Sequence, residues 1–243
     1  MAGLELLSDE QFRADGRRPN EIRRVRCKMG VFKQADGSAY LEQGDTKVLA
    51  AVYGPHEAKS GKNKPMHDQA IVNCQYSMAV FSTTERKQRP RGDRKSTEIG
   101  QNLKQTFESA ILTHLYPKSQ INIYIEILQA DGSNLAASIN AATLALVDAG
   151  IPMKGLVCCC SAGNVDDTPL IDLNHVEESQ GDLKLTIAML PLTEQILMLN
   201  MNGRLHEERL EKVMSSAKNG CKEILKDLSQ AVRDQQLDLV TGS

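Results

Sequence analysis

The sequence predicts an α+β fold, built as a single domain that spans residues 1–243. Two observations predict this class. Runs rich in β-branched and apolar residues, typical of strands, gather in the first third of the chain and return after residue 155. Helical patterns interrupt these runs without a regular alternation of strand and helix, and no linker divides the chain.

The predicted strands are short stretches dense in apolar and β-branched residues. The first two flank the turn residues Ala35, Asp36 and Gly37, which predicts a hairpin. The polar stretch 55–69 predicts an exposed loop. The stretches that predict strands are 23–32, 37–44, 46–54, 70–82, 121–128, 156–165, 183–190 and 195–201.

The predicted helices show apolar side chains at helical spacing. From residue 96 to 115 an apolar side chain recurs at every fourth position, at Ile99, Leu103, Phe107, Ile111 and Leu115. The helix after Asn134 is apolar nearly all round, so we expect it to lie buried between layers. Gly150 and Pro152 are expected to end it. A long amphipathic helix over 204–235 is expected to cover a sheet.

Composition excludes several classes of function. The formal net charge is −2, so contact with nucleic acid requires a local basic patch. No apolar run is long enough to span a membrane, and the acidic N-terminus lacks a basic leader, which argues against secretion. The six cysteines show no metal-ligand spacing, so we expect buried, reduced thiols and neither a metal nor a cofactor.

The stretch QADGSNLAASINAA, residues 129–142, is the strongest candidate for a site. A polar turn over 131–134 separates a predicted strand from the start of the apolar helix. Free backbone N–H groups and the positive end of the helix dipole meet at such a turn, which therefore suits a phosphate or another anion. The next residue, where a phosphate-binding enzyme would profit from an arginine, is Leu135.

Two basic stretches suit contact with phosphate more than stacking on bases, because they lack aromatic residues. Residues 85–95 carry six basic side chains among eleven residues, and Lys59, Lys62 and Lys64 form a weaker stretch. Both loops leave strands of the same half of the domain, so they could converge on one RNA-sized opening. A solvated charged loop is the alternative interpretation of the first stretch.

An acidic cluster with His175 among its members follows further along the chain. It consists of Asp172, Glu177, Glu178 and Asp182. Such a group could hold Mg²⁺ or supply a general acid. A solvated loop before a strand is the favoured interpretation, because exposed carboxylates are the common case.

Five long motifs follow one another along the chain: RADGRRPNEIR, MGVFKQADGSAYLEQGDTKVLAAVYGP, DRKSTEIG, QADGSNLAASINAATLALVDAGIP and LNHVEES. Together they resemble the ribonuclease-PH family, from about Arg13 to the last helix. The resemblance implies a ribosomal protein S5 domain 2-like fold, with sheets packed around central helices and a long C-terminal helix. It also implies a place in a six-membered ring with a central channel, as in the core of the RNA exosome.

The resemblance assigns roles around the polar turn. Active relatives shorten RNA from its 3′ end by phosphorolysis, and they carry Gly-Thr-Arg or Gly-Ser-Arg where this chain has Ser133, Asn134 and Leu135. A second phosphate-binding arginine is replaced by Lys95, which cannot form a bidentate contact. We therefore expect a vestigial phosphate site at Gly132, Ser133 and Asn134.

The general acid and the RNA contacts follow from the same resemblance. Lys184 stands where the family has its general-acid aspartate, and Asp182, two residues earlier, is a vestigial candidate for that role. Because the chemical positions are altered, we expect that the chain is not an enzyme and has no catalytic residue. The residues expected to bind RNA are Lys59 and Ser60, which match a loop at the mouth of the channel, and Arg94 and Lys95, which match a basic pair lining it.

The resemblance thus predicts a non-catalytic subunit of the exosome core ring that guides single-stranded RNA for 3′→5′ degradation and processing. It implies other ribonuclease-PH-like ring subunits, S1/KH-type cap subunits and a separate hydrolytic nuclease as partners, no membrane, and a location in the nucleus, nucleolus and cytoplasm. One alternative is an active phosphorolytic 3′→5′ exoribonuclease, with Asp182 as acid and Lys95 as phosphate clamp. The other is a pure scaffold of the ring, whose basic loops are buried in protein contacts.

Overall fold

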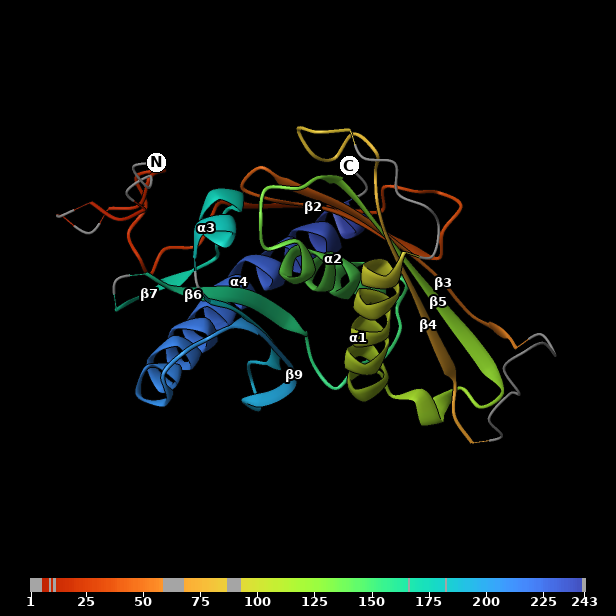
Figure 1. Ribbon diagram of the computed structural model, residues 1–243. Helices are drawn as coiled ribbons and strands as arrows, with labels where there is room; N and C mark the ends of the chain where they lie inside the picture. Colours follow the sequence, from red (N-terminus) through yellow and green to blue (C-terminus); the bar gives the residue numbers. More distant parts are fainter. Residues whose placement is uncertain are drawn as a thin grey trace.

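Helix α2, Asn134–Asp148, lies between two β-sheets in the computed structural model of the chain (Figure 1). The structure describes residues 6–8, 10, 12–58, 68–86, 93–165, 167–181 and 183–241. The strands are β1 Val25–Met29, β2 Gly37–Gln43, β3 Thr46–Glu57, β4 Ile71–Met78, β5 Ser119–Gln129, β6 Cys158–Val165, β7 Thr168–Ile171, β8 Leu183–Leu190 and β9 Gln195–Gly203. The N-terminal sheet has the order β1-β2-β3-β5-β4, and the C-terminal sheet has the order β7-β6-β8-β9.

Small side chains allow α2 to pack against both sheets. Ala136, Ala137 and Ala141 are completely buried. Its polar Asn140 is satisfied by the backbone of β6, since Nδ2 donates to the carbonyl of Cys159 at 3.0 Å and Oδ1 accepts from the amide of Cys159 at 2.9 Å. The prediction of a helix buried between layers is confirmed, and so is the α+β class.

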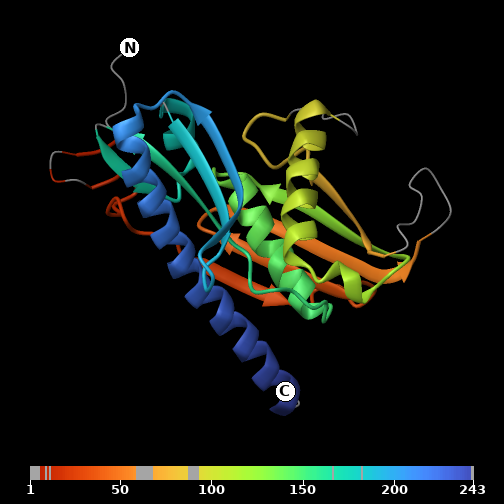
Figure 2. The same ribbon diagram turned by 90° about the horizontal axis from the view of Figure 1, so that it is seen from below.

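Three further helices and one 3₁₀ turn complete the described part of the fold. They are α1 Arg94–Ala110, the 3₁₀ turn η1 Thr113–Leu115, α3 His175–Gln180 and α4 Glu207–Thr241. Helix α1 packs on β4, whereas α4 packs on β6, β7 and β8 and also reaches β1. Figure 2 shows the C-terminal end of α4 extending past both sheets.

The helix predicted up to Leu115 ends earlier, at Ala110. Ile111 is extended and forms a β-bridge with Met153, and the amide of Lys154 donates to the carbonyl of Ala110 at 2.9 Å. Pairing with the segment after α2 therefore replaces the last helical turn, and it leaves Leu115 half exposed. The predicted strands are present, but β7 and α3 are not among the predicted elements. The interpretation of the acidic cluster as a loop accounts for α3, which lies within that cluster.

The cysteines are free thiols, and the four on β6 and α4 are buried. Burial raises the pKa of the Cys221 thiol to about 12, so this group stays protonated near neutral pH. Within the described ranges, no helix combines the length and hydrophobicity needed to cross a bilayer.

Candidate functional site

The candidate site lies at the C-terminal ends of two parallel strands of the N-terminal sheet, from which the chain continues into two helices. β4 and β5 run parallel with Met78 opposite Ile127, so the connections to α1 and α2 leave the same edge (Figure 1). Backbone bonds join these connections, from the amide of Ala79 to Ile127 at 2.9 Å and from the amide of Ala130 to Ser82 at 2.9 Å. The basic segment and the polar turn therefore begin side by side.

The first turn of α1 presents two exposed cations, Arg94 and Lys95. It contains no acidic residue, and the N-cap residue Asp93 makes no capping hydrogen bond through its side chain. Cations are unfavourable at the positive end of a helix dipole. Among the described residues neither side chain forms an ion pair, so both are available to an external anion.

The turn before α2 has the backbone shape expected of an anion site. Gly132 and Ser133 are left-handed, with φ of 79° and 52°. A Cβ at position 132 would come within 2.5 Å of the backbone of Asn174, so only glycine fits against the start of α3. The turn is therefore packed directly against the acidic cluster.

A carboxylate of the protein itself occupies this turn. The amide of Ser133 donates to Oε1 of Glu178 at 2.6 Å, and Nζ of Lys184 pairs with the same oxygen at 2.6 Å. The Ser133 hydroxyl donates to the carbonyl of Leu173 at 2.8 Å and contacts the hydroxyl of Ser161. The predicted phosphate residues Gly132, Ser133 and Asn134 thus form the turn, but Ser133 uses both its amide and its hydroxyl inside the protein.

The two substituted positions of the predicted phosphorolytic site have internal roles. Leu135 is buried, with 7% of its surface exposed, and it belongs to the core. Lys184 lies on β8 and holds Glu178. Asp182 lies outside the described residues, so its proposed role as an acid stays a prediction.

The acidic cluster is mainly a set of buried ion pairs that sequence analysis missed. Arg13 donates through Nε to Glu177 at 2.7 Å and forms a second contact with the same carboxylate through Nη2. Glu177 also completes the capping box of α3, in which its carboxylate accepts from the amide of Asn174 at 2.9 Å. The favoured interpretation as a solvated loop is therefore wrong for Asp172 and Glu177, which are buried.

Arg23 connects this cluster to the turn. Its Nη2 donates to Oδ1 of Asp172 at 2.8 Å, and its Nη1 donates to the carbonyl of Asp131 at 2.7 Å. Although burial opposes charge on Asp172, the Arg23 guanidinium holds the pKa of that carboxyl below its ordinary value. In the part of the chain that the structure describes, no three His, Cys, Asp or Glu side chains are arranged so that they could hold a metal ion together.

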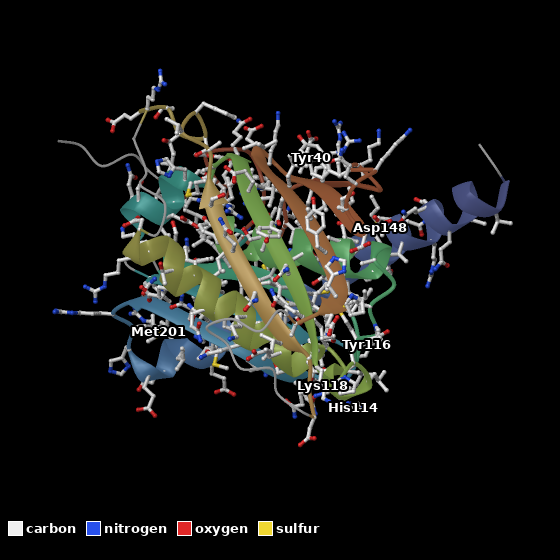
Figure 3. The ribbon with its side chains drawn as sticks, turned by 90° about the vertical axis from the view of Figure 1, so that its right-hand side faces the viewer. Tyr40, His114, Tyr116, Lys118, Asp148 and Met201 are labelled. Carbon is white, nitrogen blue, oxygen red and sulfur yellow. The ribbon has the colours of Figure 1, made fainter. Side chains whose placement is uncertain are left out.

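The second basic loop starts from the opposite end of the sheet. Lys59 and Ser60 lie outside the described residues, but the flanking amide of Ala58 donates to the carbonyl of Lys118 at 3.1 Å, just before β5. Figure 3 shows Lys118 at that end of the strand. The anchor points of the two loops thus lie at opposite ends of β5, and the described residues do not bring the loops together.

Comparison with known proteins places this arrangement in context. Two protein-family models match the chain. One is described as 3′ exoribonuclease family, domain 1, and matches residues 21–152. The other is described as domain 2 of the same family and matches residues 155–220. The exosome complex component RRP41 of Bos taurus is 58% identical over 244 residues, covering 100% of both chains.

Two solved structures share the fold. The crystal structure of rice (Oryza sativa) Rrp46 matches with a TM-score of 0.79 and 29% identity, covering 90% of this chain and 100% of that one. A structure of the Archaeoglobus fulgidus exosome with RNA bound to the active site matches with a TM-score of 0.76 and 22% identity, covering 90% of this chain and 93% of that one. The latter likeness concerns the fold alone.

These matches contradict the expectation that the chain is not an enzyme. Both family models are exoribonuclease models, and between them they cover most of the chain. The expectation rested on residues assigned by resemblance, chiefly Leu135 and Lys184. Substitutions at such positions show that an arginine and an aspartate are missing there, but they do not show that activity is missing.

Proposed function

Because the chain belongs to the ribonuclease-PH family of 3′ exoribonucleases, we propose that it binds single-stranded RNA as a core subunit of the exosome ring. In this role it guides RNA through the central channel for 3′→5′ degradation and processing. The 58% identity to an exosome complex component over the full length of both chains supports the place in the exosome.

Two cations at the start of α1, which form no ion pair with a described residue, carry the proposal for RNA. Arg94 and Lys95 are exposed, lack an acidic partner in their own helical turn and sit where the dipole disfavours positive charge. A bound phosphate would reverse that penalty, because it is attracted both by the side chains and by the helix N-terminus. The ligand that repeats such phosphates along a flexible strand is single-stranded nucleic acid.

The nature of the patch also indicates how RNA is recognised. The net charge of the chain is −2, so attraction to RNA comes from this local group and not from the molecule as a whole. Lysine and arginine without neighbouring aromatic rings contact the backbone, which gives position but no base identity. We therefore expect binding without sequence preference, as a channel subunit requires.

The proposed partners follow from the exosome assignment. Other ribonuclease-PH-like subunits would complete the ring, S1/KH-type subunits would cap it and a separate hydrolytic nuclease would receive the RNA. The proposed location is the nucleus, nucleolus and cytoplasm.

The test uses the assembled ring and a uridine-rich single strand. The double variant Arg94→Ala, Lys95→Ala should weaken RNA binding by roughly tenfold, because two phosphate contacts are lost. Lys104→Ala is the matched control, since Lys104 lies further along α1 and pairs with Glu108 at 3.6 Å. Equal affinity of the double variant and the wild type would reject the RNA role and favour a scaffold that contacts only protein.

A second candidate function is exoribonuclease activity of the chain itself, which the family description favours. The assay measures nucleoside diphosphates released from RNA by inorganic phosphate, in a ring from which other nucleases are removed. Loss of release in Asp182→Asn and in Lys95→Ala would support it, because these residues are the candidate acid and phosphate clamp. Absence of phosphate-dependent release from the wild-type ring would reject it.

A further inference from the structure

A groove of about 400 Å³ lies between β1 and α4, away from the candidate site. One wall is formed by the half-buried side chains of Val25, Cys27 and Met29 on β1. The other wall is formed by one face of α4, where Asp227 and Asp234 flank an apolar Ala231. The groove therefore has one apolar wall, on β1, and one negatively charged wall, on α4.

β1 is an edge strand of the N-terminal sheet, and four of its residues line this groove. The amide of Gly44 donates to the carbonyl of Arg24, and the amide of Gly30 donates to the carbonyl of Ser38. These bonds place the even-numbered residues of this strand in the pairs that exchange hydrogen bonds with β2. In an antiparallel ladder the odd-numbered residues of β1 therefore direct their N–H and C=O groups away from β2. In the described ranges no hydrogen bond reaches the outward groups of Val25, Cys27 or Met29.

Lys28 lines the groove and Lys226 lies near Asp227, but the structure gives neither lysine an ion pair with the acidic wall. Asp227 and Asp234 are seven positions apart on α4, so they lie on one face, two turns or about 10 Å from each other. Asp234 accepts a hydrogen bond from Gln230 at 2.7 Å, but neither carboxylate forms an ion pair with a described residue. Residues on one face of an extended chain are about 7 or 13 Å apart, so long lysine or arginine side chains on that face can reach both carboxylates.

A polar tie holds the two walls in place. Oδ1 of Asp148, at the end of α2, accepts from Nε2 of Gln235 on α4 at 2.6 Å. Its Oδ2 accepts from the amide of Ser38 on β2 at 2.9 Å. Figure 3 shows Asp148 between the sheet and the projecting part of α4. Because these hydrogen bonds link α4 to the strand that pairs with β1, they hold the two walls of the groove in a fixed arrangement.

We propose that this groove receives an extended basic segment of another exosome subunit, which adds to the N-terminal sheet as a strand beside β1. An added strand would satisfy the outward N–H and C=O groups and cover the apolar side chains of β1. Its inward lysine or arginine side chains would pair with Asp227 and Asp234. The same carboxylates repel phosphate, so RNA is not the occupant.

The proposal rests on membership of the exosome and not on RNA binding by the chain. Hydrogen exchange of residues 25–29 is compared between the isolated chain and the assembled complex. The outward amides should exchange about tenfold or more slowly in the complex, because they become hydrogen-bonded. Alkylation of Cys27 should slow in parallel, with the half-buried Cys74 on β4 as a reference thiol.

Two charge-reversal variants separate a specific groove from general burial. Asp227→Lys with Asp234→Lys should abolish the protection of β1, whereas Glu207→Lys with Glu211→Lys, exposed acids on the opposite face of α4, should not. A photocrosslinker in place of Lys28, at the rim of the groove, should label another subunit. Unchanged exchange in an assembled complex, equal effects of the two variants, or crosslinks only to RNA or to a second copy would overturn the proposal. A chain that fails to assemble would refute the exosome assignment and this inference with it.

Discussion

The guanidinium of Arg23 and the carboxylate of Asp172 form a buried bidentate ion pair, with 2.8 Å between Nη2 and Oδ1 and 3.1 Å between Nε and Oδ2. The backbone amide of Arg23 donates to the same carboxylate at 2.9 Å. Arg23 also bonds the carbonyl of Asp131, so one side chain joins the loop before α3 to the turn before α2. The geometry of the candidate site depends on this pair.

Arg23→Ala should lower the free energy of unfolding by about 3–5 kcal/mol, because it leaves the Asp172 carboxylate buried without its partner. Urea unfolding followed by circular dichroism measures this loss. Arg24→Ala is the control, since the neighbouring side chain is exposed and its removal should change stability by less than about 0.5 kcal/mol. Similar stability of the two variants would contradict the central role of the pair.

Stability should fall at acid pH because of Asp172. Burial opposes its charge, but Arg23 holds the folded-state pKa of this carboxyl below the ordinary value of 3.8. A carboxyl with a depressed folded pKa contributes stability that is present above the unfolded pKa and is lost as pH falls through the folded pKa. Asp172→Asn should therefore be less stable at neutral pH but show a flatter acid limb. Unfolding free energies between about pH 2 and pH 6 check this, and parallel curves would contradict it.

The fold could be predicted from the sequence wherever local periodicity decides it. The dense apolar and β-branched residues of β3 and the apolar, small-residue pattern of α2 specify those elements without reference to the rest of the chain. The end of α1 could not be predicted, because Ile111 leaves the helix to pair with Met153. Met153 lies beyond α2, and no residue near Ile111 in the sequence indicates this pairing.

The site was predictable in its residue types and not in its internal contacts. The glycine and serine of the turn and the basic pair at the start of α1 are visible as local motifs. The bond between Ser133 and Glu178 joins positions 45 residues apart, and the pair between Arg23 and Asp172 joins positions 149 residues apart. Paired arginines such as Arg13 carried no local signal, because their partners follow from tertiary structure.

Glu178→Ala should destabilise the protein by about 1–3 kcal/mol, because the amide of Ser133 loses a charged acceptor. Inorganic phosphate should recover part of that loss, since the start of a helix accepts anions. Thermal unfolding with and without millimolar phosphate measures both effects. Glu223→Ala, which removes an exposed acid from α4, should show neither. An equal effect of phosphate on both variants and on the wild type would mean that phosphate acts elsewhere.

The salt dependence of RNA binding should reveal whether Arg94 and Lys95 contact the RNA backbone. Each phosphate contact on a single strand contributes about 0.7 to the slope of log affinity against log salt, so Arg94→Ala with Lys95→Ala should flatten the slope by roughly 1.4. Uridine-rich and mixed sequences should weaken equally, because backbone contacts carry no base identity. Lys104→Ala, on the same helix and already paired with Glu108, should leave the slope unchanged. Weaker binding at an unchanged slope would show that the two residues act through the shape of the ring and not through phosphate.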